Sequence, residues 1–367
     1  WFDHYGSHFI QRPTLSRSRL NSQIRSRHLE TRMANPHWEN PETLAFGRLP
    51  AAAHFHRFAS KAQSKANKSS RETELSEGWR FLRVPHPEEA PSGWEQPDFD
   101  DQQFKVVSLP ALWTMDPDEI DQPIYTNVRM PFRQEPPRVP DQNPTGLYRL
   151  RLNHQSSRSL QSVLVLEGVE NCCYVFCNGH TIGFNKDSRL PAEFDLTPFL
   201  VPGENLIALM VLRFSDTSYI EDQDQWWHAG IHRPIRLSRR PWVNLRDIHA
   251  KPIFDPSSQS ARLDLSISLS AIGRGALGHS VTAALYPSGQ DRNLTQELAG
   301  HIDRAQYFPV TGKGAVIELT KSLKKVDAWS SEHPNLYDLE ITLQDPKGRV
   351  LECARLKIGF RHIEIKD

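Results

Sequence analysis

The chain has 367 residues, and its 44 lysines and arginines balance its 44 aspartates and glutamates. That balance excludes a strong overall positive field, so we expect neither a nucleic-acid partner nor an anionic membrane surface as a partner. No apolar stretch approaches the roughly 20 residues of a membrane span, so we expect a soluble protein, and the length suits two or three domains of roughly 100 to 200 residues each.

Residues 1–32 differ in composition from the rest of the chain. They contain several serines, no apolar periodicity, and arginines in excess of acids: Arg12, Arg17, Arg19, Arg25, Arg27 and Arg32 against Asp3 and Glu30. A transit peptide has a similar composition, but the chain opens with Trp1 and its first methionine is Met33. We expect residues 1–32 to be a disordered leader or an artefact upstream of a start at Met33.

We expect residues 33–70 to form an N-terminal arm. The pattern of residues 71–240 is typical of short strands. In the arm, Ala51 to Lys65 is the only plausible helix of the chain, and a weak one. Beyond the arm, Leu147 to Leu152 alternates between apolar and polar residues, and Ser162 to Leu166 is a buried β-branched and leucine run. These strands predict a β-sandwich of the jelly-roll, galactose-binding-like type over residues 71–240.

A hairpin is predicted from Cys173 to Phe184, because Asn178-Gly179 readily supplies the two positive-φ positions of a type I′ turn.

Adjacent Cys172 and Cys173 would point to opposite faces of the first strand of this hairpin. The four cysteines of the chain lack a metal-ligand spacing. We therefore expect them to be small buried side chains of a cytoplasmic protein rather than disulfides.

The run Arg213–Ile231 follows the apolar strand Leu206 to Leu212 and concentrates carboxylates and indoles in one short stretch. Carboxylates accept hydrogen bonds from sugar hydroxyls, and a flat indole suits the C–H face of a pyranose. This composition favours a sugar site.

A second all-β unit is predicted over residues 241–362. Apolar residues at 263, 265, 267 and 269 alternate with polar ones, which gives one buried and one solvated face. Two further strands flank the turn at Asp345–Gly348, and the length suits an immunoglobulin-like sandwich. Residues 363–367 would begin a linker. The predicted fold class is thus all-β, with two consecutive sandwiches.

Seven motifs in one order resemble the β-galactosidases of glycoside hydrolase family 2. They are Trp38–Pro41, Gly78–Phe81, Pro123–Val128, Asn143–Tyr148, Asp187–Leu196, Arg213–Ile231 and Trp329–Tyr337. The resemblance implies hydrolysis of terminal non-reducing β-D-galactose residues with retention. It also implies that the general acid/base glutamate and the nucleophilic glutamate lie in a TIM barrel that this chain lacks. We therefore assign no catalytic residue and expect the chain to be inactive alone.

The same resemblance implies a galactose subsite. In similar enzymes the aspartate at the position of Asp216 binds galactose hydroxyls and a bridging sodium ion, and the asparagine at the position of Asn127 hydrogen-bonds the sugar.

Near Asn40, the resemblance implies an arm that crosses a subunit interface of a homo-oligomer and helps to hold Mg²⁺. His37 replaces an aspartate usual in that motif, and imidazole prefers softer metals, which puts the Mg²⁺ site in doubt.

Two alternatives stay open. Glu221, Asp222 and Asp224 beside the indoles could be a local catalytic pair, or structural acids that pair with arginines such as Arg213 and Arg233. The structural role is favoured, because the acids are crowded on one short loop. At the level of the whole chain, the sequence could be the front part of a glycosidase, or a free-standing carbohydrate-binding or complementing module.

Overall fold

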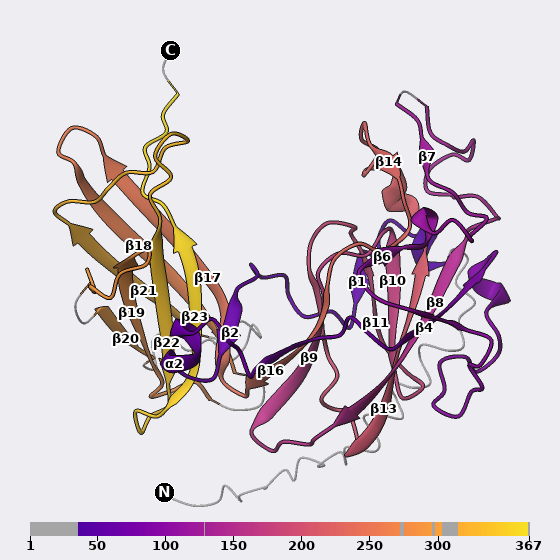
Figure 1. The fold of residues 1–367 in the computed structure, drawn as a ribbon, viewed down its shortest axis with the longest axis horizontal. Helices are drawn as coiled ribbons and strands as arrows, with labels where there is room; N and C mark the ends of the chain where they lie inside the picture. The colour runs from indigo at the N-terminus through magenta and orange to yellow at the C-terminus, as the bar shows by residue number, and fades with distance from the viewer. Residues whose placement is uncertain (1–35, 128, 272–274, 296–297, 303–314, 366–367) are drawn as a thin grey trace, which may run out of the picture.

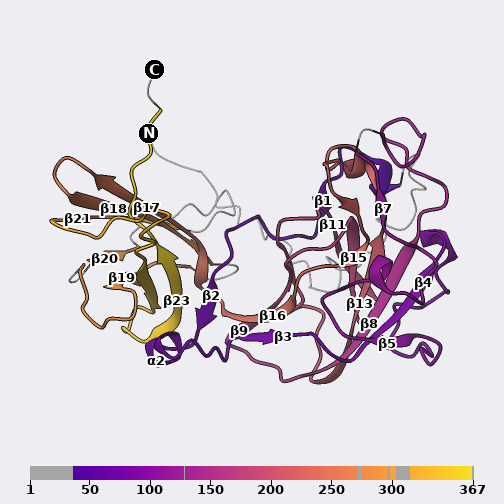
Figure 2. The ribbon, with the colours of Figure 1, turned by 45° about the horizontal axis from the view of Figure 1, so that its top comes forward.

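A computed structural model describes residues 36–127, 129–271, 275–295, 298–302 and 315–365, so the predicted leader at 1–32 lies outside the described residues. Two antiparallel β-sandwiches lie side by side (Figure 1), and a second view shows the same arrangement (Figure 2). The predicted all-β fold class is confirmed. None of the helices in this described part is long and apolar enough to cross a membrane.

Helical structure in the described residues is limited to one short α-helix and four 3₁₀ turns. These are η1 (His37–Glu39), α2 (Lys61–Lys65), η2 (Pro87–Glu89), η3 (Trp113–Met115) and η4 (Asp216–Tyr219).

The first sandwich has a seven-stranded and a four-stranded sheet. The larger sheet contains, in spatial order, β1 (Ala45–Phe46), β11 (His180–Lys186), β10 (Cys172–Cys177), β13 (Gly203–Leu212), β8 (Thr145–His154), β4 (Trp79–Val84) and β5 (Lys105–Val107). The smaller sheet contains β12 (Ala192–Asp195), β9 (Leu160–Leu166), β16 (Ile235–Pro241) and β3 (Glu72–Glu74). Two short pairs accompany them: β7 (Ile124–Tyr125) with β14 (Trp226–Trp227), and β6 (Ala111–Leu112) with β15 (Gly230–Ile231).

The predicted hairpin between β10 and β11 is confirmed. Asn178 has φ 50° and Gly179 has φ 76°, as a type I′ turn requires. Cys173 packs in the core between the two sheets, whereas Cys172 packs on the other side against Phe184 and Leu212. All four cysteines are buried and unpaired, as expected.

The second sandwich packs a three-stranded sheet on a five-stranded sheet. The first contains β17 (Asn244–Asp255), β18 (Ser260–Ser270) and β21 (Val316–Leu323). The second contains β2 (His56–Phe58), β23 (Val350–Ile358), β22 (Tyr337–Gln344), β19 (Ser280–Pro287) and β20 (Leu298–His301). Buried and half-buried residues alternate along β18, which puts its leucines in the core.

The arm contributes a strand to each sandwich. β1 pairs with β11 of the first, and β2 pairs with β23 of the second. The expected helix from Ala51 to Lys65 is therefore wrong over its first half, because Phe58 is only 2% exposed in the second sandwich and its segment must be extended to reach β23. Gly47, with φ +66°, lets the arm run so close to β11 that an added Cβ would collide with the carbonyl of Ile182.

Buried and partly buried ion pairs join the arm and the two sandwiches where β16 ends and β17 begins. Glu193 of β12 accepts hydrogen bonds from Arg240 at 2.5 and 2.9 Å and also pairs with Arg246 of β17. Glu352 of β23 pairs with Arg57 of the arm at 2.6 Å. We call these five residues the junction network. Burial alone would raise the pKa of Glu193, but Arg240, Arg246 and Arg57 outweigh it and lower that pKa to about 2.

The depressed pKa of Glu193 predicts a specific loss of stability in acid. Its stabilising contribution is present above the ordinary pKa of 4.5 and is lost as the pH falls toward about 2. Between pH 6 and pH 3 we expect the free energy of unfolding of the wild type to fall by about 2 kcal/mol more than that of Glu193→Gln. Urea unfolding at both pH values measures this difference.

Glu204→Gln is the matched control, because Glu204 pairs with Arg151 on the surface with its side chain 69% exposed. Its pH dependence should follow that of the wild type. Equal pH dependence of Glu193→Gln and the wild type would show that the junction network does not stabilise the ionised carboxylate.

Candidate functional site

The carboxylate- and indole-rich run forms a loop at the end of the first sandwich where β13 ends. It contains η4, β14 and β15, and β14 pairs with β7 so that Trp226 lies opposite Tyr125. Figure 1 shows β7 and β14 together at this end. The motif with Asn127 and the motif with Asp216 are thus brought to the same end of the sandwich, although far apart in sequence.

Asp216 begins the turn η4, and the turn is fixed by a capping box. The Ser215 side chain accepts a hydrogen bond from the amide of Thr217, and Ser218 Oγ accepts one from the amide of Ser215. The Ser215 hydroxyl also contacts Asn171. These bonds hold Asp216, which is only 8% exposed, in a defined orientation.

Lys186, the last residue of β11, is the partner of Asp216. Its Nζ lies 2.6 Å from Asp216 Oδ1 and donates to the carbonyl oxygen of Asn40 at 2.9 Å. Its side chain is fully buried. Lys186 therefore links two residues that the sequence singled out, Asp216 and Asn40. Sequence reasoning missed Lys186. The feature that could have pointed to it is the position of a lysine at the end of a buried strand, directly before the Asp187–Leu196 motif.

The residues around Asp216 and Asn40 do not fit the expected metal ions. A hard cation prefers several oxygen ligands, yet the ammonium of Lys186 already lies against both the Asp216 carboxylate and the Asn40 carbonyl. Asn40 Oδ1 accepts from the amide of Glu42 at 3.1 Å, and His37 Nδ1 lies 3.0 Å from the Tyr174 hydroxyl. Among the residues that the structure describes, no group of three or more His, Cys, Asp or Glu side chains could hold a metal.

Asn127 lies in an exposed group beside β7. The Tyr125 hydroxyl donates to Asp224 Oδ1 at 2.6 Å. This hydrogen bond raises the pKa of Tyr125, and a hydrogen bond with Asn127 opposes the increase. The rings of Tyr125 and Trp226 lie 5.4 Å apart, and these two side chains are 50% and 54% exposed. We call Tyr125, Asn127, Asp224 and Trp226 the aromatic edge.

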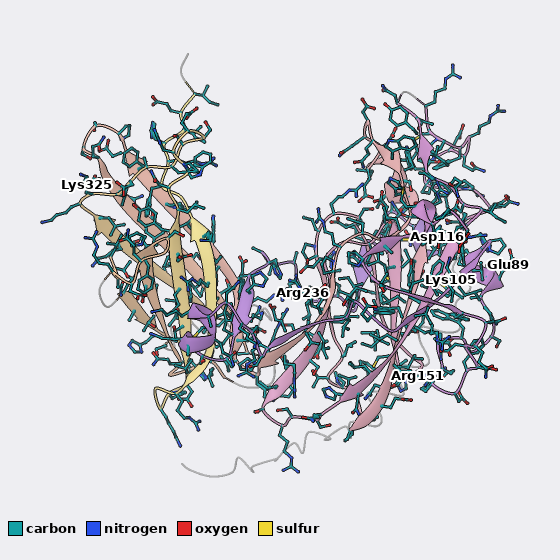
Figure 3. The ribbon with its side chains drawn as sticks, viewed as in Figure 1. Glu89, Lys105, Asp116, Arg151, Arg236 and Lys325 are labelled. Carbon is teal, nitrogen blue, oxygen red and sulfur yellow. The ribbon has the colours of Figure 1, made fainter. Side chains whose placement is uncertain are left out.

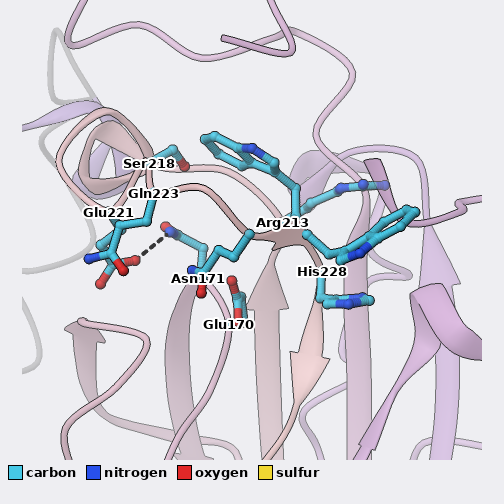
Figure 4. A pocket seen from close by; sticks show the side chains of 10 residues that line it. Glu170, Asn171, Arg213, Ser218, Glu221, Gln223 and His228 are labelled. Atoms are coloured by element: carbon cyan, nitrogen blue, oxygen red, sulfur yellow. Dashed lines mark hydrogen bonds between the residues drawn. The ribbon is translucent and has the colours of Figure 1, made fainter. Parts of the chain in front are cut away.

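A small pocket lies beside the aromatic edge, and Figure 4 shows its lining, with Glu221 next to Asn171 on one side and His228 on the other. Only about 10 Å³ of it is open to the centre of a water-sized sphere, which is roughly enough for one water molecule and too small for a pyranose. Glu170 in this pocket binds Arg189 at 2.8 and 3.1 Å. Burial, the largest cause, raises the pKa of Glu170 despite that arginine.

Two of the three loop acids, Glu221 and Asp224, have structural partners. Glu221 accepts hydrogen bonds from the amide and hydroxyl of Ser188 at 2.9 and 2.6 Å and from the Asn171 side chain at 3.1 Å. Asp224 binds Tyr125 as described, and Asp222 is exposed. The partners of Glu221 and Asp224 thus favour the structural alternative over a local catalytic pair.

The expected arginine partners of these acids were wrong. Arg213, buried at the base of the loop, pairs with Asp121 and donates to the carbonyl of Gln122 at 3.0 Å. Arg233 donates to the carbonyl of Arg189 at 2.5 Å. Arg213 lines the small pocket together with Glu221, but its ion-pair partner is Asp121.

Comparison with protein families gives two adjacent matches. Residues 73–241 match "Glycosyl hydrolases family 2, sugar binding domain", and residues 243–361 match "Glycosyl hydrolases family 2". A β-galactosidase from Vibrio cholerae serotype O1 is 36% identical over 332 residues, which cover 89% of this chain and 32% of that protein. One from Pectobacterium atrosepticum is 35% identical over 91% of this chain and 32% of its own length. The chain thus spans about a third of the length of these relatives.

Solved structures show the same fold at lower identity. A putative β-galactosidase from Bacteroides fragilis has a TM-score of 0.63 at 20% identity, covering 80% of this chain and 42% of that chain. A β-glycosidase from Bacteroides vulgatus has a TM-score of 0.60 at 22% identity, covering 80% of this chain and 34% of that chain. At these identities the similarity supports the arrangement of the sandwiches alone.

The structural role of Glu221 predicts a stability effect. Because Glu221 accepts three hydrogen bonds, Glu221→Gln should lower the free energy of unfolding by about 2 kcal/mol, the usual range for bonds to a charged acceptor. Urea unfolding measures the loss. Asp222→Asn, at the exposed neighbouring position, is the control and should change stability by less than about 0.5 kcal/mol. A Glu221→Gln variant as stable as the wild type would contradict the assignment.

Proposed function

Because the chain belongs to family 2 of the glycosyl hydrolases, we propose that it forms the N-terminal, non-catalytic part of a β-galactosidase. The complete enzyme would hydrolyse terminal non-reducing β-D-galactose residues with retention. This part would contribute Asn127 and Asp216 to the galactose subsite. The aromatic edge is the observation that carries the proposal, because it exposes two ring faces, a carboxylate and an amide within one small area.

Each group of the aromatic edge suits a sugar in a different way. The rings of Tyr125 and Trp226 offer apolar faces to C–H groups, and the Asn127 amide offers both a donor and an acceptor to a hydroxyl. Asp224 already orients the Tyr125 hydroxyl at 2.6 Å. Asp216 lies deeper at the same end, so it would receive only a sugar group that reaches past the edge.

The chemical step would rely on residues outside those described. A retaining glycosidase uses two carboxyl groups about 5 to 5.5 Å apart, one as acid/base and one as nucleophile. The carboxylates of the loop serve structural partners, and the aligned relatives continue well beyond the matched third. The catalytic glutamates would therefore lie in a barrel that follows these two sandwiches in the complete enzyme.

Na⁺ and Mg²⁺ would belong to the complete enzyme, and neither is assigned a ligand among the described residues. The complete enzyme would be a cytoplasmic homo-oligomer, with the arm near a subunit contact. The four buried, unpaired cysteines support a reducing compartment.

A second candidate is a free-standing carbohydrate-binding or complementing module. It is favoured by the presence of a separate hydrophobic core in each sandwich, since such cores stabilise a fold without further domains. Calorimetric titration of the chain with galactose distinguishes the two. Saturable binding by the isolated chain would favour the module, whereas binding only in the presence of the barrel would favour the enzyme part.

The isolated chain should not release nitrophenol from a nitrophenyl β-D-galactoside above the buffer blank. General acid/base catalysis alone is worth about 10² to 10⁴ in rate, and the proposed acid and nucleophile are both outside this chain. The complete enzyme under the same conditions is the positive control. Turnover by the isolated chain that disappears in Glu221→Gln or Asp224→Asn would overturn the assignment of the loop acids.

In the complete enzyme, Asn127→Ala should raise KM for the galactoside about fivefold, because one neutral hydrogen bond is worth about 1 kcal/mol. Asn153→Ala is the matched control, since Asn153 is exposed on β8 near the end remote from the site. Steady-state kinetics of both variants measure the effect. An unchanged KM in Asn127→Ala would remove this residue from the subsite.

A further inference from the structure

Lys186 is a buried cation at the position where the family resemblance leads one to expect a sodium ion. Its ammonium lies 2.6 Å from Asp216 Oδ1 and 2.9 Å from the Asn40 carbonyl oxygen. The Lys186 side chain is fully buried and that of Asp216 is 7% exposed. The environment of the Asp216 carboxylate therefore already contains one full positive charge with two oxygen contacts.

The backbone leaves Lys186 little freedom to move away. Its amide donates to the carbonyl of Leu44 at 3.0 Å, and its residue pairs with Cys172 in the ladder between β10 and β11. The side chain starts from a strand in the middle of a packed sheet region, with the Phe184 ring centroid 5.9 Å from Nζ. Separating the ammonium from Asp216 would leave both groups buried without an opposite charge, which is strongly unfavourable.

A second monovalent cation on the same carboxylate would be repelled by this ammonium. A buried carboxylate of charge −1 is neutralised by one cation, and any further positive charge at that depth is unpaired. We infer that the ammonium of Lys186 replaces a sodium ion at Asp216, so that this chain holds Asp216 in its orientation without a metal. The inference rests on the proposed function only for the role of Asp216 in a sugar subsite.

The replacement has two consequences for the site. A sugar group that reaches Asp216 would meet a carboxylate and an ammonium rather than a metal ion. Because Lys186 also binds the Asn40 carbonyl, the same charge fixes the arm to this end of the first sandwich. Lys186 is thus a positioning residue that acts through Asp216 and Asn40.

The test measures ion specificity without any sugar. Thermal unfolding of the wild-type chain is compared in NaCl, KCl and choline chloride at equal ionic strength. We expect one Tm in all three salts, because no site for sodium is open. A Tm that rises in NaCl alone, by the roughly 2 to 4 °C that sodium at about five times its Kd produces, would overturn the inference.

Two variants probe the position itself. Lys186→Met removes the charge and keeps an unbranched side chain, so its Tm should fall in choline chloride and recover by roughly 2 to 4 °C in NaCl. Lys186→Arg keeps a cation there and should not respond to sodium. A folded Lys186→Met protein with no response to sodium would also overturn the inference.

Lys105→Met is the matched control. Figure 3 shows Lys105 beside Asp116, and Lys105 Nζ contacts Asp116 and Glu119 at 2.7 and 2.6 Å with its side chain 37% exposed. Loss of this hydrated pair should give no preference for sodium over potassium.

If Lys186→Met does not fold, the ²³Na NMR relaxation rate in the presence of wild-type protein tests the inference instead. Equal relaxation with wild-type and Asp216→Asn protein supports the inference, and faster relaxation with the wild type overturns it. Neither result depends on galactose binding, so a failure of the proposed function would leave this test intact.

Discussion

The junction network is the interaction on which the arrangement of the two sandwiches depends. Glu193 of the first sandwich contacts Arg246 of the second, and Glu352 of the second contacts Arg57 of the arm. Glu352 also accepts a hydrogen bond from the amide of Leu245 at 2.8 Å, which fixes the first residues of β17. Buried charges are stable only when every partner is in place, so the relative position of the sandwiches and the course of the arm are determined together.

In the candidate site, the residues that hold the loop in place differ from those that would bind a ligand. The Lys186–Asp216 pair and the contacts of Glu221 with Ser188 and Asn171 fix the loop through buried groups. The rings of the aromatic edge are exposed. A rigid support for exposed groups allows rings and amides to bind a ligand with little loss of conformational freedom. The division also explains why an acid-rich loop need not be a catalytic one.

Local patterns in the sequence predicted several of the longer strands. The Asn178-Gly179 hairpin, the apolar strand that became β13 and the alternation along β18 depend on neighbouring residues, and the structure has all three. The extended path of the arm at Phe58 was not predictable in this way, because it depends on β23 almost three hundred residues later. Lys186 was missed for the same reason, since its two partners come from the arm and from η4. The placement of Asn127 and Asp216 at one end of the sandwich came from the resemblance of motifs, not from periodicity.

The pairing of β2 with β23 also sets an order of events during synthesis. β2 ends at Phe58, whereas its partner strand begins at Val350. At roughly 5 to 20 residues per second, a ribosome takes on the order of 15 to 60 s to make the chain between them. Throughout that time Phe55 and Phe58 have no sandwich to enter, and Arg57 has no Glu352. A segment made well before its partner strand is therefore among the last to be built into the fold, and its apolar residues are available to chaperones until then.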